Sequence, residues 1–191
     1  MSRIAPLRPP YAPEIQAQFD RIMRGAPPLM LFRVMAGHSR AWDKFRAGSL
    51  LDPGPLPLRQ REIVIDRTCA LNRCEYEWGV HVAIFASAAQ LSDEQVRATV
   101  LGDAAAPCWS KAEQALIAAV DALHHCSTLT DAEFADLSAH YDDDQILEII
   151  LLCGFYRTVA YLANGLALPL EERAVRFPTT PPRPAADRAG G

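Results

Sequence analysis

Apolar residues recur at helical spacing along almost the whole of this 191-residue chain. Alternating β-branched runs, of the kind that tight turns join into hairpins, are absent from the sequence. The pattern therefore predicts an all-α fold. Half of the residues are hydrophobic, which suits one compact domain at this length and is too little for two full ones. We expect a single helical domain over residues 1–176 and a Pro-rich flexible tail over 177–191, which cannot bury enough surface to fold alone.

Start and stop signals divide the predicted domain into groups of helices. The N-terminal helices occupy residues 12–51, where Pro13 suits a first helical turn and Gly25 suits a stop. A loop rich in Pro and Gly separates them from two helices within residues 58–89, one ending near residue 72 and the next running from about Cys74 to Ala89. The C-terminal helices lie within residues 110–166. In total we expect about seven to eight helices.

Three helix starts carry clear capping signals. Ser92 precedes an acidic first turn, Ser110 and Glu113 have the spacing of a capping box, and Asp142 precedes the last long apolar segment. This last segment, residues 145–168, is apolar on most of its faces. Such a pattern predicts a central or interface helix.

Composition excludes several classes of protein. The formal charge is −4 and the arginines are scattered, so nucleic acid is not an expected partner. The five cysteines lack paired Cys-x-x-Cys units, which argues against a disulfide scaffold or a structural zinc site. The chain shows neither a leader pattern nor an uncharged apolar run of roughly 18 residues. We expect a cytoplasmic protein that is not embedded in a membrane.

The segment RCEYEWGVH, residues 73–81, concentrates chemically active side chains. On a helix that begins near Cys74, the side chains of Cys74, Glu77, Trp78 and His81 share one face. The helix macrodipole favours an ionised Glu77 or a Cys74 thiolate near the N-terminus and leaves His81 more able to act as a base. Spacing alone permits two interpretations, a buried reactive site or a solvated Glu–His pair on the surface.

The segment REIVIDRTCALNRCEYEWGVHVAIFASAAQLSDEQV, residues 61–96, resembles the signature of the carboxymuconolactone decarboxylase and AhpD-like alkylhydroperoxidase superfamily. The arrangement over residues 28–171 is similar too. The peroxidase branch carries a glutamate, a Cys-x-x-Cys twelve positions later, and a histidine four positions after the second cysteine. Glu62, Cys74 and His81 match this pattern, while Glu77 occupies the place of the second cysteine.

The substitution by Glu77 favours a non-redox reaction. Thiol peroxidases need a second sulfur that resolves the sulfenic acid, and Cys69 lies five residues upstream on a different predicted helix. The decarboxylase-like branch, by resemblance, carries Tyr-Glu-Trp-x-x-His, here Tyr76, Glu77, Trp78 and His81. His81 would then be the general acid or base, Glu77 its partner, and Glu62 a supporting carboxylate. An AhpD-like thiol peroxidase or antioxidant protein that uses Cys74 is the alternative.

The non-redox interpretation implies a cofactor-independent lyase that acts on a small organic acid or lactone, such as an intermediate of aromatic-compound catabolism. Donors must then stabilise an enolate, and Arg59, Arg61 and Tyr156 are candidates, with Tyr76 and Trp78 as further substrate-binding residues. A metal site is not expected. Adjacent residues such as His124 and His125 diverge on a helix, and the Glu77–His81 pair lacks the second histidine of zinc proteases.

The resemblance also implies a homo-oligomer, commonly a trimer or a hexamer. The apolar residues of the last helix agree, because one subunit of this size has limited interior in which to bury two apolar faces. A non-catalytic helical oligomer, in which the same polar residues fasten an interface, is therefore a second alternative.

Overall fold

The computed structural model describes residues 2–179 and shows nine α-helices and no β-strand among them. The all-α prediction is confirmed, but the helices outnumber the expected seven to eight. The helices are α1 (Pro13–Met23), α2 (Met30–Met35), α3 (Ser39–Ala47), α4 (Leu58–Leu71), α5 (Glu75–Phe85), α6 (Asp93–Leu101), α7 (Lys111–Cys126), α8 (Asp131–Ser138) and α9 (Asp143–Gly165).

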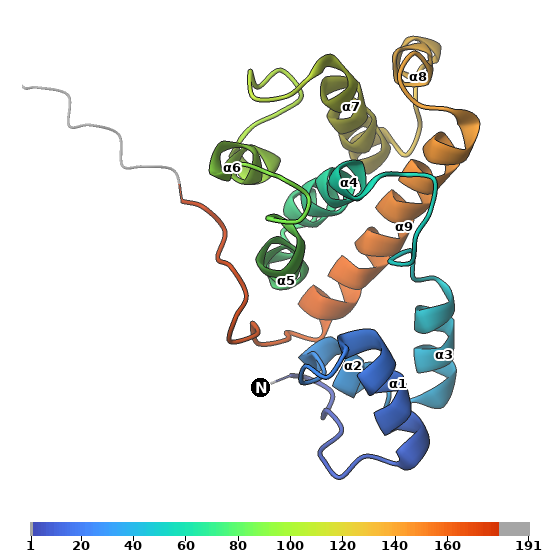
Figure 1. The fold of residues 1–191 in the computed structure, drawn as a ribbon, viewed down its shortest axis with the longest axis vertical. Coiled ribbons are helices and arrows are strands. Elements are labelled where there is room, and N and C mark those ends of the chain that lie inside the picture. Colours follow the sequence, from blue (N-terminus) through green and yellow to red (C-terminus); the bar gives the residue numbers. More distant parts are fainter. Residues whose placement is uncertain (1, 180–191) are drawn as a thin grey trace, which may run out of the picture.

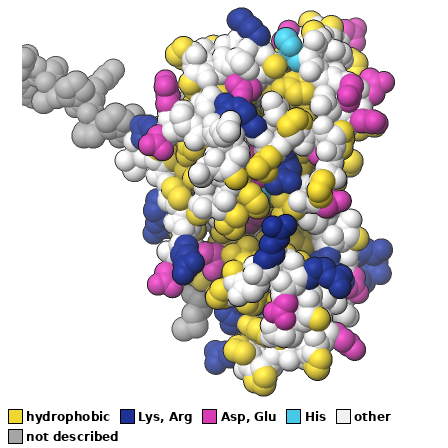
Figure 2. Space-filling view, in the orientation of Figure 1, with side chains coloured by type: hydrophobic (Ala, Val, Ile, Leu, Met, Phe, Trp, Pro, Cys, Tyr) yellow, Lys and Arg dark blue, Asp and Glu magenta, His cyan; other side chains and the backbone are white. Residues whose placement is uncertain are grey.

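Two helices form the centre of the molecule. Helix α4 packs against α5, α6, α7 and α9, and α9 also contacts α5, α7 and α8. Helices α1 to α3 form a separate lobe at one end, next to the C-terminal half of α9 (Figure 1). The lobe is joined to α9 through aromatic contacts, because Phe45 of α3 packs on Phe155 with 5.4 Å between ring centroids. In the space-filling view, hydrophobic side chains gather in the crease between the lobe and the rest (Figure 2).

Helix α4 is buried along most of its length. Every residue from Arg61 to Cys69 is buried, and four of these nine are charged. Charged groups inside a protein are costly unless they are paired, so each needs a partner on a neighbouring helix. Three of the four have ion-pair partners, whereas none is found for Asp66 among the described residues, and one set of these residues forms the candidate site described below.

The predicted capping signals are confirmed. Ser92, Ser110 and Asp142 each accept a hydrogen bond from the backbone N–H three residues ahead, and each forms a reciprocal capping box. Helix α5 differs from its predicted span, because it begins at Glu75 with Cys74 as the N-cap and ends at Phe85, before Ala89. Gln90 adopts a left-handed φ of 55° and Leu91 donates to the Ala86 carbonyl, which ends the helical path.

Helix α9 combines a core face with an exposed apolar face. It is the one helix of the described residues that is long and apolar enough to cross a membrane, and it lies within the bundle against α4, α5 and α7. Its outer side carries an exposed stripe, which we call the α9 stripe. The α9 stripe consists of Leu147 (59% exposed), Ile150 (38%), Leu151 (59%) and Tyr161 (61%).

After α9 the chain turns back and crosses α5. We call residues 168–177 the C-terminal strap. The Val175 N–H donates to the Gly79 carbonyl at 3.1 Å, and the Phe177 ring packs on Trp78 with 5.1 Å between centroids. A Cβ atom at position 79 would collide with the Val175 carbonyl oxygen, so this close approach requires glycine. Phe177, predicted as the first tail residue, is thus packed, and residues 180–191 of the predicted tail lie outside the described residues.

Candidate active site

His81 lies where three helices meet. From its position on α5, its Nδ1 atom is 2.8 Å from Glu62 Oε2 on α4, and its Nε2 atom is 3.1 Å from the Tyr156 hydroxyl on α9. Glu77, one turn earlier on α5, places Oε1 3.4 Å from the same Nε2. The side chains of these residues are at most 10% exposed. Both ring nitrogens of His81 therefore face polar partners inside the protein. We use the name His81 cluster for six residues: His81, Glu62, Glu77, Tyr156, Arg61 and Asp66.

Arg61 provides the second positive charge. Its Nε donates to Glu62 Oε1 at 3.0 Å, and another of its nitrogens lies 2.9 Å from the same oxygen. It also donates to the Leu51 carbonyl at 3.2 Å, and its guanidinium carbon lies 5.5 Å from the centroid of the Phe85 ring. Glu62 thus divides its two oxygens between Arg61 and His81, which fixes the orientation of both.

Asp66 is a member of the cluster that the sequence interpretation missed. It lies one turn after Glu62 on α4 and is 1% exposed. Burial raises the pKa of Asp66 well above its usual value; the charge of Glu62 adds to the shift and the charge of His81 opposes it. Its position four residues after Glu62, within a run of buried residues, is the sequence signal that points to it.

The cluster holds more acidic oxygens than it has partners for. Among the described residues, Glu77 Oε2 and Asp66 Oδ1 are buried and have no hydrogen-bond partner. Buried polar atoms of this kind are uncommon, and they concentrate at functional sites. The cluster therefore differs from a simple ion pair that fastens two helices.

The protonation of His81 differs from the sequence-based expectation. Burial lowers the pKa of His81, but hydrogen bonds to Glu62 and Glu77 and the charges of these carboxylates outweigh it and raise the pKa to about 10. The macrodipole favours a neutral imidazole, but two carboxylates within ion-pair distance outweigh it. At neutral pH the imidazole is protonated and is equipped to act as an acid.

The environment of Cys74 differs from that of a reactive thiol. It is fully buried, as is Cys69, and its N–H donates to the Cys69 carbonyl at 2.9 Å. Burial raises the pKa of Cys74 to about 12; a hydrogen bond from the Glu77 backbone lowers it, and the Glu77 charge raises it further. The predicted thiolate is therefore not favoured, because desolvation exceeds the effect of the helix N-terminus.

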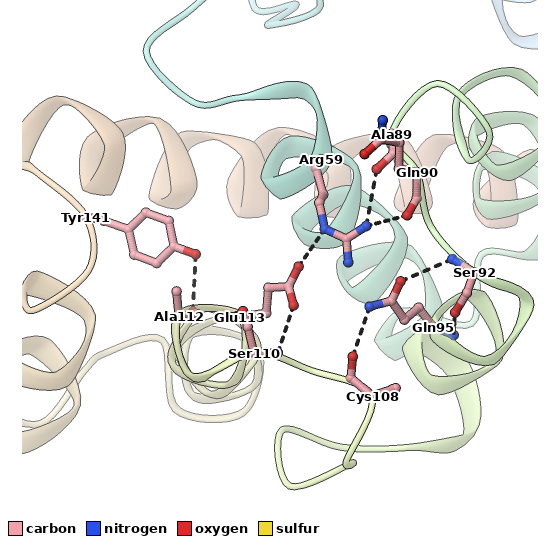
Figure 3. Close-up of polar contacts among 10 residues, drawn as sticks. All are labelled: Arg59, Ala89, Gln90, Ser92, Gln95, Cys108, Ser110, Ala112, Glu113 and Tyr141. Atoms are coloured by element: carbon pink, nitrogen blue, oxygen red, sulfur yellow. Dashed lines mark hydrogen bonds and ion pairs between the residues drawn. The ribbon is translucent and has the colours of Figure 1, made fainter.

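Arg59 lies outside the cluster, contrary to the prediction. Its Nε donates to Glu113 Oε1 at 2.7 Å, and it also donates to the carbonyls of Ala89 and Gln90 (Figure 3). The second Glu113 oxygen accepts from the Ser110 N–H at 2.9 Å. We call these contacts the Arg59 network. It joins α4 to α7 and to the turn after α5, and no contact places Arg59 beside His81.

Tyr76 and Trp78 also point away from the cluster. The Tyr76 hydroxyl donates to Glu171 of the strap and accepts from the Leu31 N–H at 3.0 Å. The Trp78 indole N–H donates to Thr99 Oγ1 on α6 at 3.0 Å. Of the four side chains predicted to share a reactive face, only Glu77 and His81 reach the cluster. Tyr76 and Trp78 instead fasten α5 to its neighbours.

Metal-ligating side chains do not converge in the part of the chain that the structure describes. No group of three or more His, Cys, Asp and Glu residues is placed there to hold an ion. His124 and His125, which are adjacent on α7, have rings inclined at 84° to one another.

Comparison with known proteins identifies the fold and one matching family model. Over 91% of this chain and 93% of the other, the structure matches an uncharacterised peroxidase-related protein from Silicibacter sp. TM1040, with a TM-score of 0.79 and 17% identity. An AhpD-core, peroxidase-related protein from Ralstonia eutropha JMP134 matches with a TM-score of 0.78, 17% identity and coverage of 90% and 93%. The fold is thus that of an AhpD-like helical protein. Residues 36–121 match the model of the carboxymuconolactone decarboxylase family.

A third similar structure is a variant of the debrominase Bmp8 in complex with 2,3,4-tribromopyrrole. It matches with a TM-score of 0.71 and 13% identity, over 91% of this chain and 94% of that one. No curated protein sequence matches the chain. At these identities the three structures establish a shared fold, and the chemistry of this chain must be argued from its own residues.

Proposed function

We propose that this chain is a cofactor-independent enzyme of the decarboxylase or lyase type, which acts by proton transfer on a small organic acid or lactone. The observation that carries the proposal is the placement of His81, with Glu62 on one ring nitrogen and Tyr156 and Glu77 on the other. A histidine held in this way has a fixed orientation and a fixed site for its transferable proton.

The raised pKa of His81 assigns it the role of acid. In decarboxylation of a β-keto or vinylogous acid, the bond between the carboxylate carbon and its neighbour breaks, carbon dioxide leaves, and the electron pair forms an enolate. The Nε2–H of His81 then donates a proton to that enolate, and solvent restores the proton to the imidazole. Tyr156 and Arg61 are the donors nearest to His81 and Glu62 that can stabilise the enolate oxygen.

Phe85 is the residue that governs access in this proposal. Its ring is half-buried, and the ring centroid lies 5.3 Å from the centroid of the His81 ring. The guanidinium carbon of Arg61 lies 5.5 Å from the Phe85 ring centroid. Ile84, beside it at the end of α5, is 53% exposed. Rotation of Phe85 would open the cluster beside an apolar surface, which suits a substrate with an apolar ring or chain.

The thiol alternative has less support from this structure. Cys74 is buried, its pKa is raised, and position 77 provides a carboxylate where a resolving thiol would be needed. Its support is the description of several similar structures as peroxidase-related. A Cys74→Ser variant in the assay below distinguishes the two proposals, because only thiol chemistry requires that sulfur.

The deciding experiment compares wild type and His81→Gln on a panel of β-keto acids, vinylogous acids, lactones and an alkyl hydroperoxide with a dithiol. We expect turnover of an acid or lactone to fall by about 10²- to 10⁴-fold in the variant, with helicity retained in circular dichroism. The exposed His38 provides the matched control, as His38→Gln. Full activity in a folded His81→Gln protein, or hydroperoxide turnover that depends on Cys74, would contradict the proposal.

We further propose that the chain forms a homo-oligomer through the α9 stripe, in line with the trimer or hexamer that the family resemblance implies. Leu147 and Leu151 are the exposed leucines of α9, whereas Leu162 and Leu166 are half-buried. Leu151→Glu should reduce the mass measured by light scattering, because a charge buried in an interface lacks a partner. Leu101→Glu, at an exposed leucine on α6, is the control. A wild-type protein with the mass of one subunit would refute the oligomer.

A further inference from the structure

A cavity lies on the other side of α4 from the His81 cluster. It has a volume of about 240 Å³ and is lined by α4, α7 and α9, with Thr68 of α4 and its C-cap Asn72 on one side. No member of the His81 cluster lines it. On α4, Thr68 is two residues from Asp66 and therefore lies about 200° around the helix from it. The cavity is thus separate from the candidate active site.

The cavity carries a positive charge without a counter-charge. Arg157 donates to the Tyr161 hydroxyl at 2.7 Å and to the His124 carbonyl at 3.2 Å, both of which are neutral. None of the residues that line the cavity is acidic, and Arg157 forms no ion pair with a described residue. The contrast with Arg67 is clear, since Arg67 binds both oxygens of Asp121 at 2.6 and 2.8 Å. A half-buried guanidinium without a carboxylate partner favours an anionic ligand.

One polar atom of a cavity-lining residue also lacks a partner. His124 Nδ1 has no hydrogen-bond partner among the described residues, while Thr68, which is only 3% exposed, has its hydroxyl beside the Cys153 thiol. Burial, together with the charge of Arg157, lowers the pKa of His124, so its imidazole is neutral at pH 7. These groups add neutral hydrogen-bonding capacity beside the charge of Arg157.

The remaining walls limit the size and polarity of a ligand. Val120, Leu123 and Ile150 form an apolar surface, and Gly154 leaves an open space where another residue would place its Cβ atom. Pockets for drug-sized ligands measure roughly 300–1,000 Å³, so this smaller cavity suits a single ring or a short branched chain.

We propose that this cavity is a binding site for a small monocarboxylate with an apolar ring or branched chain. The carboxylate group would bind Arg157, and the apolar body would pack against Val120 and Leu123. This site is independent of the proposed reaction at His81, because the two share no residue. It borders the α9 stripe, through Ile150 in its wall and through Tyr161, which bonds Arg157.

The test is a titration of the full-length, ¹⁵N-labelled protein with benzoate and with its uncharged analogue benzamide. We expect benzoate to shift the amide resonances of Thr68, Gly154 and Arg157 in a saturable way, and benzamide to bind about tenfold more weakly or not at all. The amides of Gly79 and His81 report on the candidate active site and should not move.

Three variants test the assignment. Arg157→Gln should weaken benzoate binding by about tenfold or more, because it removes the charge and keeps a donor. Gly154→Leu should abolish binding by filling the cavity, and its helical backbone tolerates the side chain. Arg97→Gln, at an exposed arginine on α6, is the control and should bind as wild type does.

The proposal would be overturned by equal binding of benzoate and benzamide, or by shifts that gather around Gly79 and His81. It would equally be overturned if folded Arg157→Gln and Gly154→Leu proteins both bind like the parent. Absence of saturable benzoate binding up to about 20 mM, where a millimolar ligand approaches saturation, would also refute it.

Discussion

The first turns of α4 contribute to two polar groups, the Arg59 network and the His81 cluster, which differ in how completely their polar atoms are bonded. In the Arg59 network, both oxygens of Glu113 have donors, and one terminal nitrogen of Arg59 donates to two backbone carbonyls (Figure 3). In the His81 cluster, three residues further along the same helix, Glu77 and Asp66 keep buried oxygens without a described partner. Both groups contain an arginine–glutamate pair. The two groups differ in how many of their carboxylate oxygens accept hydrogen bonds, rather than in their residue types.

The difference contrasts a structural ion pair with a candidate reactive cluster on one helix. The carboxylate of the Arg59 network has both oxygens bonded, so it serves to join helices. The His81 cluster keeps buried acceptor oxygens without a bond beside an imidazole whose pKa is raised. The two groups should also respond to pH in opposite directions, since the pKa of His81 is raised and the pKa of Glu113 is lowered.

The largest expected effect is on activity, when the carboxylate of each group is replaced by an amide. Glu62→Gln should reduce turnover about 100-fold or more, because His81 loses the carboxylate that orients it and holds its proton. Glu113→Gln should leave turnover per folded molecule unchanged and lower the free energy of unfolding by about 1–3 kcal/mol. Steady-state kinetics on the substrate found with the panel and urea unfolding measure both. Equal losses of activity in the two variants would erase the distinction.

The second prediction concerns alkaline pH. Because the pKa of His81 is about 10 in the folded protein and near 6.5 when unfolded, its stabilisation is complete below pH 6.5 and is lost as pH rises towards 10. The expected loss in the free energy of unfolding is on the order of a few kcal/mol. Urea unfolding at pH 6, 8 and 10 should show a steeper decline in wild type than in His81→Gln. Parallel curves would mean that His81 is neutral in the folded protein.

The smallest expected effect lies on the acid side. Burial opposes ionisation of Glu113, but hydrogen bonds from Ser110 and Arg59 outweigh it and lower the pKa below 4.5. This stabilisation is present above that pH and is lost as pH falls. Arg59→Gln should lower the free energy of unfolding by about 1–2 kcal/mol at pH 7 and flatten the acid-side decline. Arg46→Gln, which breaks the exposed pair with Asp43, should cost at most about 0.5 kcal/mol.

Much of the architecture follows from local sequence signals. Helix periodicity predicted the all-α fold, and capping residues such as Ser92, Ser110 and Asp142 marked their helix starts correctly, because both depend on neighbouring residues. The end of α5 was less predictable. Its apolar pattern continues past Phe85, and the turn that stops it depends on the left-handed backbone of Gln90.

The candidate site was predictable only in part. The spacing of Glu77 and His81 and the family resemblance pointed to these two residues and to Glu62, and Arg61 and Tyr156 were named as candidate donors. Spacing could not reveal that these residues are buried together. Arg59 and Arg61 are two residues apart in sequence and have different partners, which only the packing of α4 decides. The protonation of His81 depends on desolvation and charges in three dimensions, so no local pattern could provide it.

The C-terminal strap has a consequence for the order of events during synthesis. Helix α5 leaves the ribosome almost one hundred residues before Val175, whose N–H binds the Gly79 carbonyl, and before Phe177, which packs on Trp78. At about 5–20 residues per second, the outer face of α5 stays bare for roughly 5–20 s on a nascent chain. A chaperone that recognises exposed aromatic side chains has that interval in which to bind, and docking of the strap ends it.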